Sequence, residues 1–159
     1  LVTIGGASVG ERDLVASALR GEGLELEFWK IAMRPGKPML YGRMGHQRVL
    51  GLPGNPVSAI VCARVFLVPM LRRLLGLAAE LQTKEAMLGE AIETNGPREH
   101  YMRAVSHWTP TGERVVRPLA SQDSSLVADL ARADCLIVRP VDAPAAPKGS
   151  RVQILPLDD

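Results

Sequence analysis

The sequence predicts the α/β fold class, with an α/β unit over residues 1–76 followed by a small, mostly β domain over residues 77–159. Two observations support this prediction. Up to Gly76, apolar runs alternate between strand and helix periodicity, which is typical of α/β units. Beyond Gly76 the runs are short and turn residues separate them, which favours a sandwich or an open barrel.

The first domain is expected to begin with an apolar strand over residues 1–4, which leads through a glycine-rich turn into a helix over residues 12–20. Gly21 is expected to end this helix. The apolar side chains that should pack inward are Leu14, Val15, Ala18 and Leu19. Because the chain opens on an apolar run without a Met, we interpret residues 1–4 as a strand entered midway and the chain as a fragment of a longer protein.

A second strand is predicted over residues 26–33, and the stiff loop Pro35-Gly36-Lys37-Pro38 should follow it. A hairpin around Gly45 is expected to join residues 39–41 to residues 48–52.

The clearest helix start in the chain lies at Asn55 and Pro56. Asn is a preferred N-cap residue, and Pro is tolerated at the first helical position because no hydrogen-bonded amide is lost there. The helix should run to about Leu75, with Gly76 as its end and a kink near Pro69. Since it is apolar on most sides, it is expected to be enclosed by the protein.

The second domain is predicted to consist mainly of short strands. The apolar runs that indicate them lie at residues 86–92, 101–108, 114–118, 135–140 and 151–157. One helix is expected over residues 124–133, and the Pro- and Ala-rich segment 143–149 is predicted to be a loop.

Composition excludes several functional classes. The net charge of +2, with scattered basic residues and few aromatic ones (Phe 2, Trp 2, Tyr 2), argues against a nucleic-acid partner. The most apolar stretch, residues 57–71, contains Arg64 and is shorter than the ~20 residues that a membrane span needs. Cys62 and Cys135 belong to no ligand pattern, so we expect buried thiols in a reducing compartment.

The glycine-rich turn at residues 5–10 is a candidate anion-binding element. Its glycines (Gly5, Gly6, Gly10) permit close backbone approach, and the helix start beyond Ser8 would offer amide donors to a phosphate or another oxyanion. An ordinary glycine-rich turn is the alternative. Residues 6–10 also match the G-x-S-x-G pattern of serine hydrolases, which stays a rival although the histidines (His46, His100, His107) have no catalytic context.

Further along, three side chains could carry chemistry. Asp13 is either a first-turn carboxylate favoured by the helix dipole or a Mg²⁺ ligand. Lys37 is either a solvated turn residue or an anion contact held in place by the flanking prolines. Ser58 either caps the helix or, together with free amides, binds a tetrahedral oxyanion.

In this order and spacing, the motifs closely resemble those of the molybdenum insertase family, which includes bacterial MoeA and the E domain of gephyrin. The resemblance rests on residues 5–13, 28–38, 51–59 and 66–69. It is dense over residues 1–76 and looser over residues 77–159, with conservative departures at Ile4 and Ala7. It implies that residues 1–76 are the C-terminal half of a doubly wound molybdopterin-binding domain, and that the second domain is a small β-sandwich or barrel.

The resemblance also implies an activity in molybdenum cofactor biosynthesis. Members take adenylylated molybdopterin and molybdate and yield molybdenum cofactor and AMP, assisted by Mg²⁺ or Zn²⁺. Asp13, Lys37 and Ser58 would be the catalytic residues, and Asp13 would also bind the metal. The residues that would bind the substrates are Gly5, Gly6, Ser8, Gly10, Pro35, Gly36, Pro53, Gly54, Asn55 and Pro56.

Finally, the resemblance implies a cytoplasmic homodimer that assembles through N-terminal domains which this sequence does not contain. Because the family's active site borrows residues from the second subunit, we expect the chain alone to be inactive. The alternative from another functional class is a non-catalytic molybdopterin-binding or scaffolding module. The joint presence of Asp13, Lys37 and Ser58 argues against it, since scaffolding does not require them.

Overall fold

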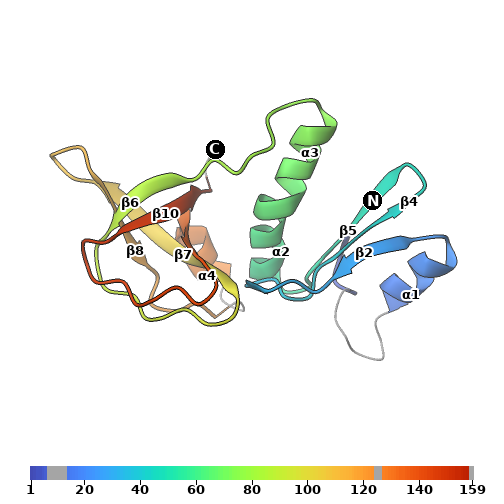
Figure 1. Cartoon of the computed structure of the whole chain (residues 1–159), viewed down its shortest axis with the longest axis horizontal. Coiled ribbons are helices and arrows are strands. Elements are labelled where there is room, and N and C mark those ends of the chain that lie inside the picture. The colour runs from blue at the N-terminus through green and yellow to red at the C-terminus, as the bar shows by residue number, and fades with distance from the viewer. Residues whose placement is uncertain (7–13, 124–126, 158–159) are drawn as a thin grey trace. The chain divides into compact units, whose positions relative to one another are not determined.

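The computed structural model describes residues 1–6, 14–123 and 127–157 of the chain. The chain folds into two compact units, Leu1–Ala79 and Glu80–Asp159 (Figure 1). No helix within the described ranges is long and apolar enough to cross a membrane.

The first unit contains a sheet with the strand order β1-β5-β4-β2. β1 (Val2–Ile4) pairs in parallel with β5 (Gln47–Leu52), and β4 (Leu40–Met44) pairs antiparallel with both β5 and β2 (Glu25–Trp29). The predicted hairpin is confirmed, because β4 and β5 are joined by a turn in which Gly45 has a φ of +58°.

The prediction of one continuous strand over residues 26–33 is wrong. The structure has β2 (Glu25–Trp29) and a separate two-residue strand, β3 (Met33–Arg34). The break follows from Lys30, which has a φ of +71° and therefore leaves the extended conformation before the proline-bearing loop begins.

The buried face of α1 (Leu14–Gly21) matches the predicted one only in part: Leu19 packs inward as expected, but Leu14 and Ala18 are exposed. Ala16 is its buried residue, whereas Leu14 is 74% exposed. Ala16 and Leu19, three residues apart, face a small core in the sheet, so Leu14 and Ala18 lie on the opposite side of the helix. The other buried members of that core are Leu24, Leu40 and Val49.

The long helix begins as predicted but changes its hydrogen-bonding pattern before Pro69. It consists of α2 (Pro56–Cys62), a π-helical turn η1 (Ala63–Leu67) and α3 (Val68–Leu74), and Figure 1 shows α2 and α3 following one another as a single rod. The amide of Val68 donates to the carbonyl of Ala63, five residues earlier. Pro69 has no amide hydrogen to donate to the preceding turn, and the π turn absorbs this irregularity upstream of the proline.

Burial along this rod is also uneven. α2 buries most of its residues, but α3 buries none, so the expectation of a helix enclosed along its length is wrong for the last segment. Gly76, with a φ of +73°, ends the rod as predicted.

The second unit is a β-barrel rather than a sandwich. Its strands are β6 (Lys84–Leu88), β7 (Glu99–Trp108), β8 (Arg114–Pro118), β9 (Cys135–Arg139) and β10 (Arg151–Pro156). They follow the order β7-β8-β6-β10-β9, and the additional pairing of β7 with β9 closes the ring. Every pair is antiparallel except β6 with β8.

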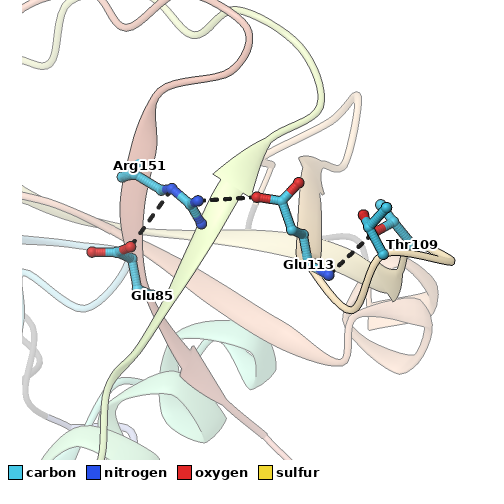
Figure 2. Close-up of polar contacts among 5 residues, drawn as sticks. Glu85, Thr109, Glu113 and Arg151 are labelled. Carbon is cyan, nitrogen blue, oxygen red and sulfur yellow. Dashed lines mark hydrogen bonds and ion pairs between the residues drawn. The ribbon is translucent and has the colours of Figure 1, made fainter.

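The strand predicted at residues 86–92 lies earlier in the chain, in β6, because it ends before Gly89. The helix predicted in this unit corresponds to α4 (Val127–Arg132). Inside the ring is a core of fully buried side chains, among them Leu88, Val116, Ile137 and Ile154. On the surface, Arg151 bridges Glu85 and Glu113, and Figure 2 shows this chain of contacts continuing to Thr109.

Candidate functional site

The glycine-rich turn begins where β1 ends. Gly5 and Gly6 have φ angles of +79° and +69°, which glycine adopts without steric cost. The amide of Gly5 donates to the carbonyl of Leu52 at 3.0 Å, so the turn starts beside the end of β5. The predicted site residues Ser8, Gly10 and Asp13 lie outside the described residues, and their roles stay predictions.

The glycine-rich turn that begins at Gly5 lies against the turn that precedes α2. A Cβ atom added to Gly54 would stand 3.3 Å from the Cα of Gly5, which is tighter than most contacts of a real Cβ. The φ of Gly54 is not in the left-handed region, so the close approach to Gly5 is what limits the side chain at this position. The structure therefore brings together two of the motifs that the sequence placed about fifty residues apart.

The turn before α2 is organised by its cap. The side-chain oxygen of Asn55 accepts a hydrogen bond from the amide of Ser58 at 3.2 Å, as the N-cap prediction requires. The Ser58 hydroxyl lies 3.5 Å from the same oxygen, and Ser58 is buried. The amide of Ser58 is thus occupied by the cap, and the amide of Ala59 donates to the carbonyl of Asn55, so neither is among the free amides expected at this helix start. Pro53 is buried, whereas Gly54 and Pro56 are exposed.

The Pro-Gly-Lys-Pro loop is fixed at two points. Gly36 is buried and has a φ of +113°, and any Cβ added to it would overlap the Cys62 thiol on α2. The carbonyl oxygen of Lys37 accepts hydrogen bonds from the amides of Ile31 and Met39, both at 3.1 Å. The peptide bond between Arg34 and Pro35 is cis. The backbone of Lys37 is therefore anchored, while its side chain is exposed.

Cys62 and Ser58 lie four residues apart on α2, so they share one face of that helix. The loop that carries Lys37 consequently docks on the same helix face as the Ser58 hydroxyl, about one turn away. No hydrogen bond or ion pair of the Lys37 side chain is found within the described part of the chain. The structure thus brings together the segments that carry Lys37 and Ser58 without joining the two side chains directly.

Sequence reasoning missed two features of this unit. The contact between Gly36 and Cys62 has no local signal, because the two residues are distant in the sequence. An apolar pocket of about 180 Å³ also opens in the unit, lined by Phe28, Tyr41, Leu50, Phe66 and Met70. Two of its three aromatic rings, those of Phe28 and Tyr41, have centroids 5.5 Å apart. None of the predicted site residues lines it, so this pocket is not the predicted anion site.

Among the described residues, no three His, Cys, Asp or Glu side chains converge as a metal site. Asp13, the predicted ligand of Mg²⁺ or Zn²⁺, is not among them, so the fit of a metal rests on the sequence alone.

Both halves of the sequence match known families. Residues 1–73 match the family described as "Probable molybdopterin binding domain", and residues 85–157 match the family described as "MoeA C-terminal region (domain IV)". Two curated relatives are the molybdopterin molybdenumtransferases of Haemophilus influenzae and Bacillus subtilis. The first is 31% identical over 99% of this chain and 39% of its own length, and the second is 30% identical over 98% of this chain and 36% of its own length.

A solved structure is similar in fold to this chain. The molybdopterin biosynthesis MoeA protein from Pyrococcus horikosii is 27% identical and has a TM-score of 0.77, covering 99% of this chain and 37% of that chain. The present chain therefore spans less than two fifths of the length of each of these three proteins.

Proposed function

This chain belongs to the molybdopterin molybdenumtransferase (MoeA) family, and we propose that it forms part of an enzyme that inserts molybdate into adenylylated molybdopterin with release of AMP. The observation that carries the proposal is the convergence of three motifs near α2. The Gly5 turn lies against Gly54, and the loop of Lys37 docks one helical turn from Ser58.

The proposed roles follow from the chemistry of these groups. The Lys37 ammonium would neutralise charge on molybdate. The Ser58 hydroxyl, which donates to the Asn55 side-chain oxygen at 3.5 Å in the structure, would turn to donate its hydrogen bond to a molybdate oxygen. The turn at Gly5 and Gly6, with Ser8 and Gly10 beyond it, would hold the phosphate of the pterin. The substrate-contacting backbone would come from Pro35, Gly36, Pro53, Gly54, Asn55 and Pro56.

In this proposal the protein forms no covalent bond with the substrate. Catalysis would come from holding the two anionic substrates in reactive geometry and from neutralising their charge. Asp13 would hold Mg²⁺ or Zn²⁺, which would supply further charge neutralisation on the substrate oxygens when bound.

The test uses the complete gene product that contains this chain. AMP release from adenylylated molybdopterin is measured against molybdate concentration for the wild type, Lys37→Ala and Ser58→Ala. Arg73→Ala, which removes an exposed cation of the same unit from α3, is the matched control. Both site variants should lose about 100-fold in rate, the effect typical of removing one oxyanion-stabilising donor. Equal rates in the site variants and the control would overturn the proposal.

We also propose that the 159-residue chain is inactive by itself and that the enzyme is a cytoplasmic homodimer. The relatives are more than twice as long as the segment they share with this chain. In addition, β1 leaves Ile4 71% exposed, which indicates an apolar sheet edge that further structure would cover. Molybdate-dependent AMP release by the isolated chain would contradict the first claim, and a monomeric complete gene product in sedimentation analysis would contradict the second.

A further inference from the structure

The contact between Cys62 and Gly36 gives this thiol a defined place relative to the proposed site. Cys62 is fully buried in α2, and its Sγ lies 4.0 Å from the carbonyl oxygen of Gly36. The Cβ that would overlap Cys62 would also lie 3.1 Å from the terminal methyl of Met33. Two sulfur-bearing side chains thus pack against Gly36 and leave no space for a side chain at residue 36.

This contact determines the position of the loop along α2. Lys37 follows Gly36 directly, and its carbonyl oxygen is held by the amides of Ile31 and Met39. Ser58 lies four residues before Cys62 on the same helix face. A displacement of the loop at Cys62 would therefore move the backbone of Lys37 relative to Ser58.

The chemistry of the thiol suits a neighbouring anion. Burial raises the pKa of Cys62 to about 12, so the thiol is neutral at physiological pH and adds no negative charge beside the loop. A carboxylate at this position would repel an oxyanion, and an ammonium would be buried without a partner.

We propose that Cys62 is a positioning residue: through its contact with Gly36, it sets the separation between the Lys37 ammonium and the Ser58 hydroxyl in the oxyanion site. The inference rests on the proposed function, because it assigns the oxyanion to that site. Cys62 itself does not touch the substrate in this account. A smaller side chain would let the loop move toward α2, and a larger one would push the loop away.

The chain offers a matched control in Cys135. This second thiol is also fully buried, and burial likewise raises its pKa to about 12, with a further contribution from Asp134. It lies in β9 of the barrel, where its Sγ is 3.8 Å from the carbonyl oxygen of Ala104. Cys62→Ala and Cys135→Ala remove the same atom from equally buried places, so a general loss of packing should affect both variants alike.

The experiment compares these variants in the complete gene product. In Cys62→Ala, the KM for molybdate should rise about tenfold with a smaller change in kcat, since a misplacement of 1 Å can cost about 100-fold. The KM for adenylylated molybdopterin should stay unchanged. Cys135→Ala should leave both KM values at the wild-type level. If Cys62→Ala and Cys135→Ala have the same KM for molybdate in an active enzyme, the inference is wrong and the proposed function stands.

A second measurement does not depend on activity. The amides of Ile31 and Met39 are protected by their bonds to Lys37, so hydrogen exchange at these two amides reports on the loop. Their exchange should accelerate in Cys62→Ala and not in Cys135→Ala, and unchanged exchange in both would overturn the inference. A wild-type protein without molybdate-dependent AMP release would instead overturn the proposed function, and the exchange data would still decide whether Cys62 holds the loop.

Discussion

The two units of the chain differ in whether their sheets have unpaired edge strands. In the second unit, β7 pairs with both β8 and β9, so the sheet closes on itself around a continuous buried core. In the first unit the sheet is open, and its edge strand β1 leaves Val2 and Ile4 exposed. Closure removes unpaired strand edges, whereas an open sheet depends on what covers it. Both units bury an apolar core, so the comparison is between a closed sheet and an open one, and the predicted chemistry lies in the unit with the open sheet.

The largest effect on the free energy of unfolding is expected from replacing two equally buried leucines, one in each unit. Leu88 lies in the barrel core and Leu40 in the small core beneath α1, and each is 1% exposed. Leu→Ala in a core costs about 2–5 kcal/mol, depending on how far the surroundings can collapse into the space. We expect Leu88→Ala to lie near the upper end, because a closed ring of strands relaxes little. Leu40→Ala should lie near the lower end.

Urea denaturation of both variants, followed by circular dichroism, measures this difference in the free energy of unfolding. Equal losses in the two variants would contradict the contrast drawn between the closed and the open sheet. A larger loss for Leu40→Ala would reverse it.

The next effect concerns the pH dependence that the two buried thiols produce. Burial raises the pKa of Cys62 and of Cys135 from 9.0 to about 12. Between these values the unfolded chain releases the thiol protons and the folded chain retains them, so stability is intact below pH 9 and falls as the pH rises toward 12. Each thiol should contribute a slope of about 1.4 kcal/mol per pH unit within this range.

Cys62→Ser and Cys135→Ser should each flatten the dependence, and denaturation curves recorded from pH 8 to pH 11 measure it. A serine hydroxyl does not ionise in this range, so the variant lacks the proton release of the unfolded chain. Tyr101 also has a raised pKa, of about 12, and supplies a common background to every variant. A slope as steep as that of the wild type would show that the thiol in question is not held neutral by burial.

The sequence correctly predicted those elements whose start or turn is determined by neighbouring residues. Asn55 with Pro56 indicated the start of α2, and Gly45 indicated the hairpin of β4 and β5. The break after β2 could not be predicted, because Lys30 adopts a left-handed φ without being Gly, Asn or Asp. The buried face of α1 was predicted only in part, for a different reason: in a helix this short, the sheet rather than the sequence pattern decides which side packs inward.

In the candidate site, too, some features could be predicted from the sequence and others could not. Each motif could be found in the sequence, since glycines and prolines mark the turns at Gly5, Gly36 and Gly54. The contacts between motifs could not be found in the sequence. Gly5 meets Gly54, and Gly36 meets Cys62, only through the packing of β1, β5 and α2. The roles of Lys37 and Ser58 stay predictions, and so do those of Ser8, Gly10 and Asp13.

The smallest expected effect comes from surface ion pairs, which extend the comparison from the cores of the two units to their exteriors. In the barrel, Arg151 lies 3.7 Å from Glu85 and 3.0 Å from Glu113, and the amide of Glu113 donates to Thr109 within the adjoining turn (Figure 2). In the first unit, Arg43 on β4 pairs with one carboxylate, that of Glu27 on β2. All of these ionic side chains are about half exposed, so solvent screens them strongly.

Arg151→Gln and Arg43→Gln should therefore each lower the free energy of unfolding by less than about 1 kcal/mol. The loss should be greater for Arg151, because its guanidinium connects two carboxylates from different parts of the barrel. Urea denaturation at low salt and in 1 M NaCl separates this charge effect from packing, since the difference from the wild type should shrink at high salt. A loss of several kcal/mol for Arg151→Gln, or one that salt leaves unchanged, would mean that the barrel depends on its surface network as well as on its core.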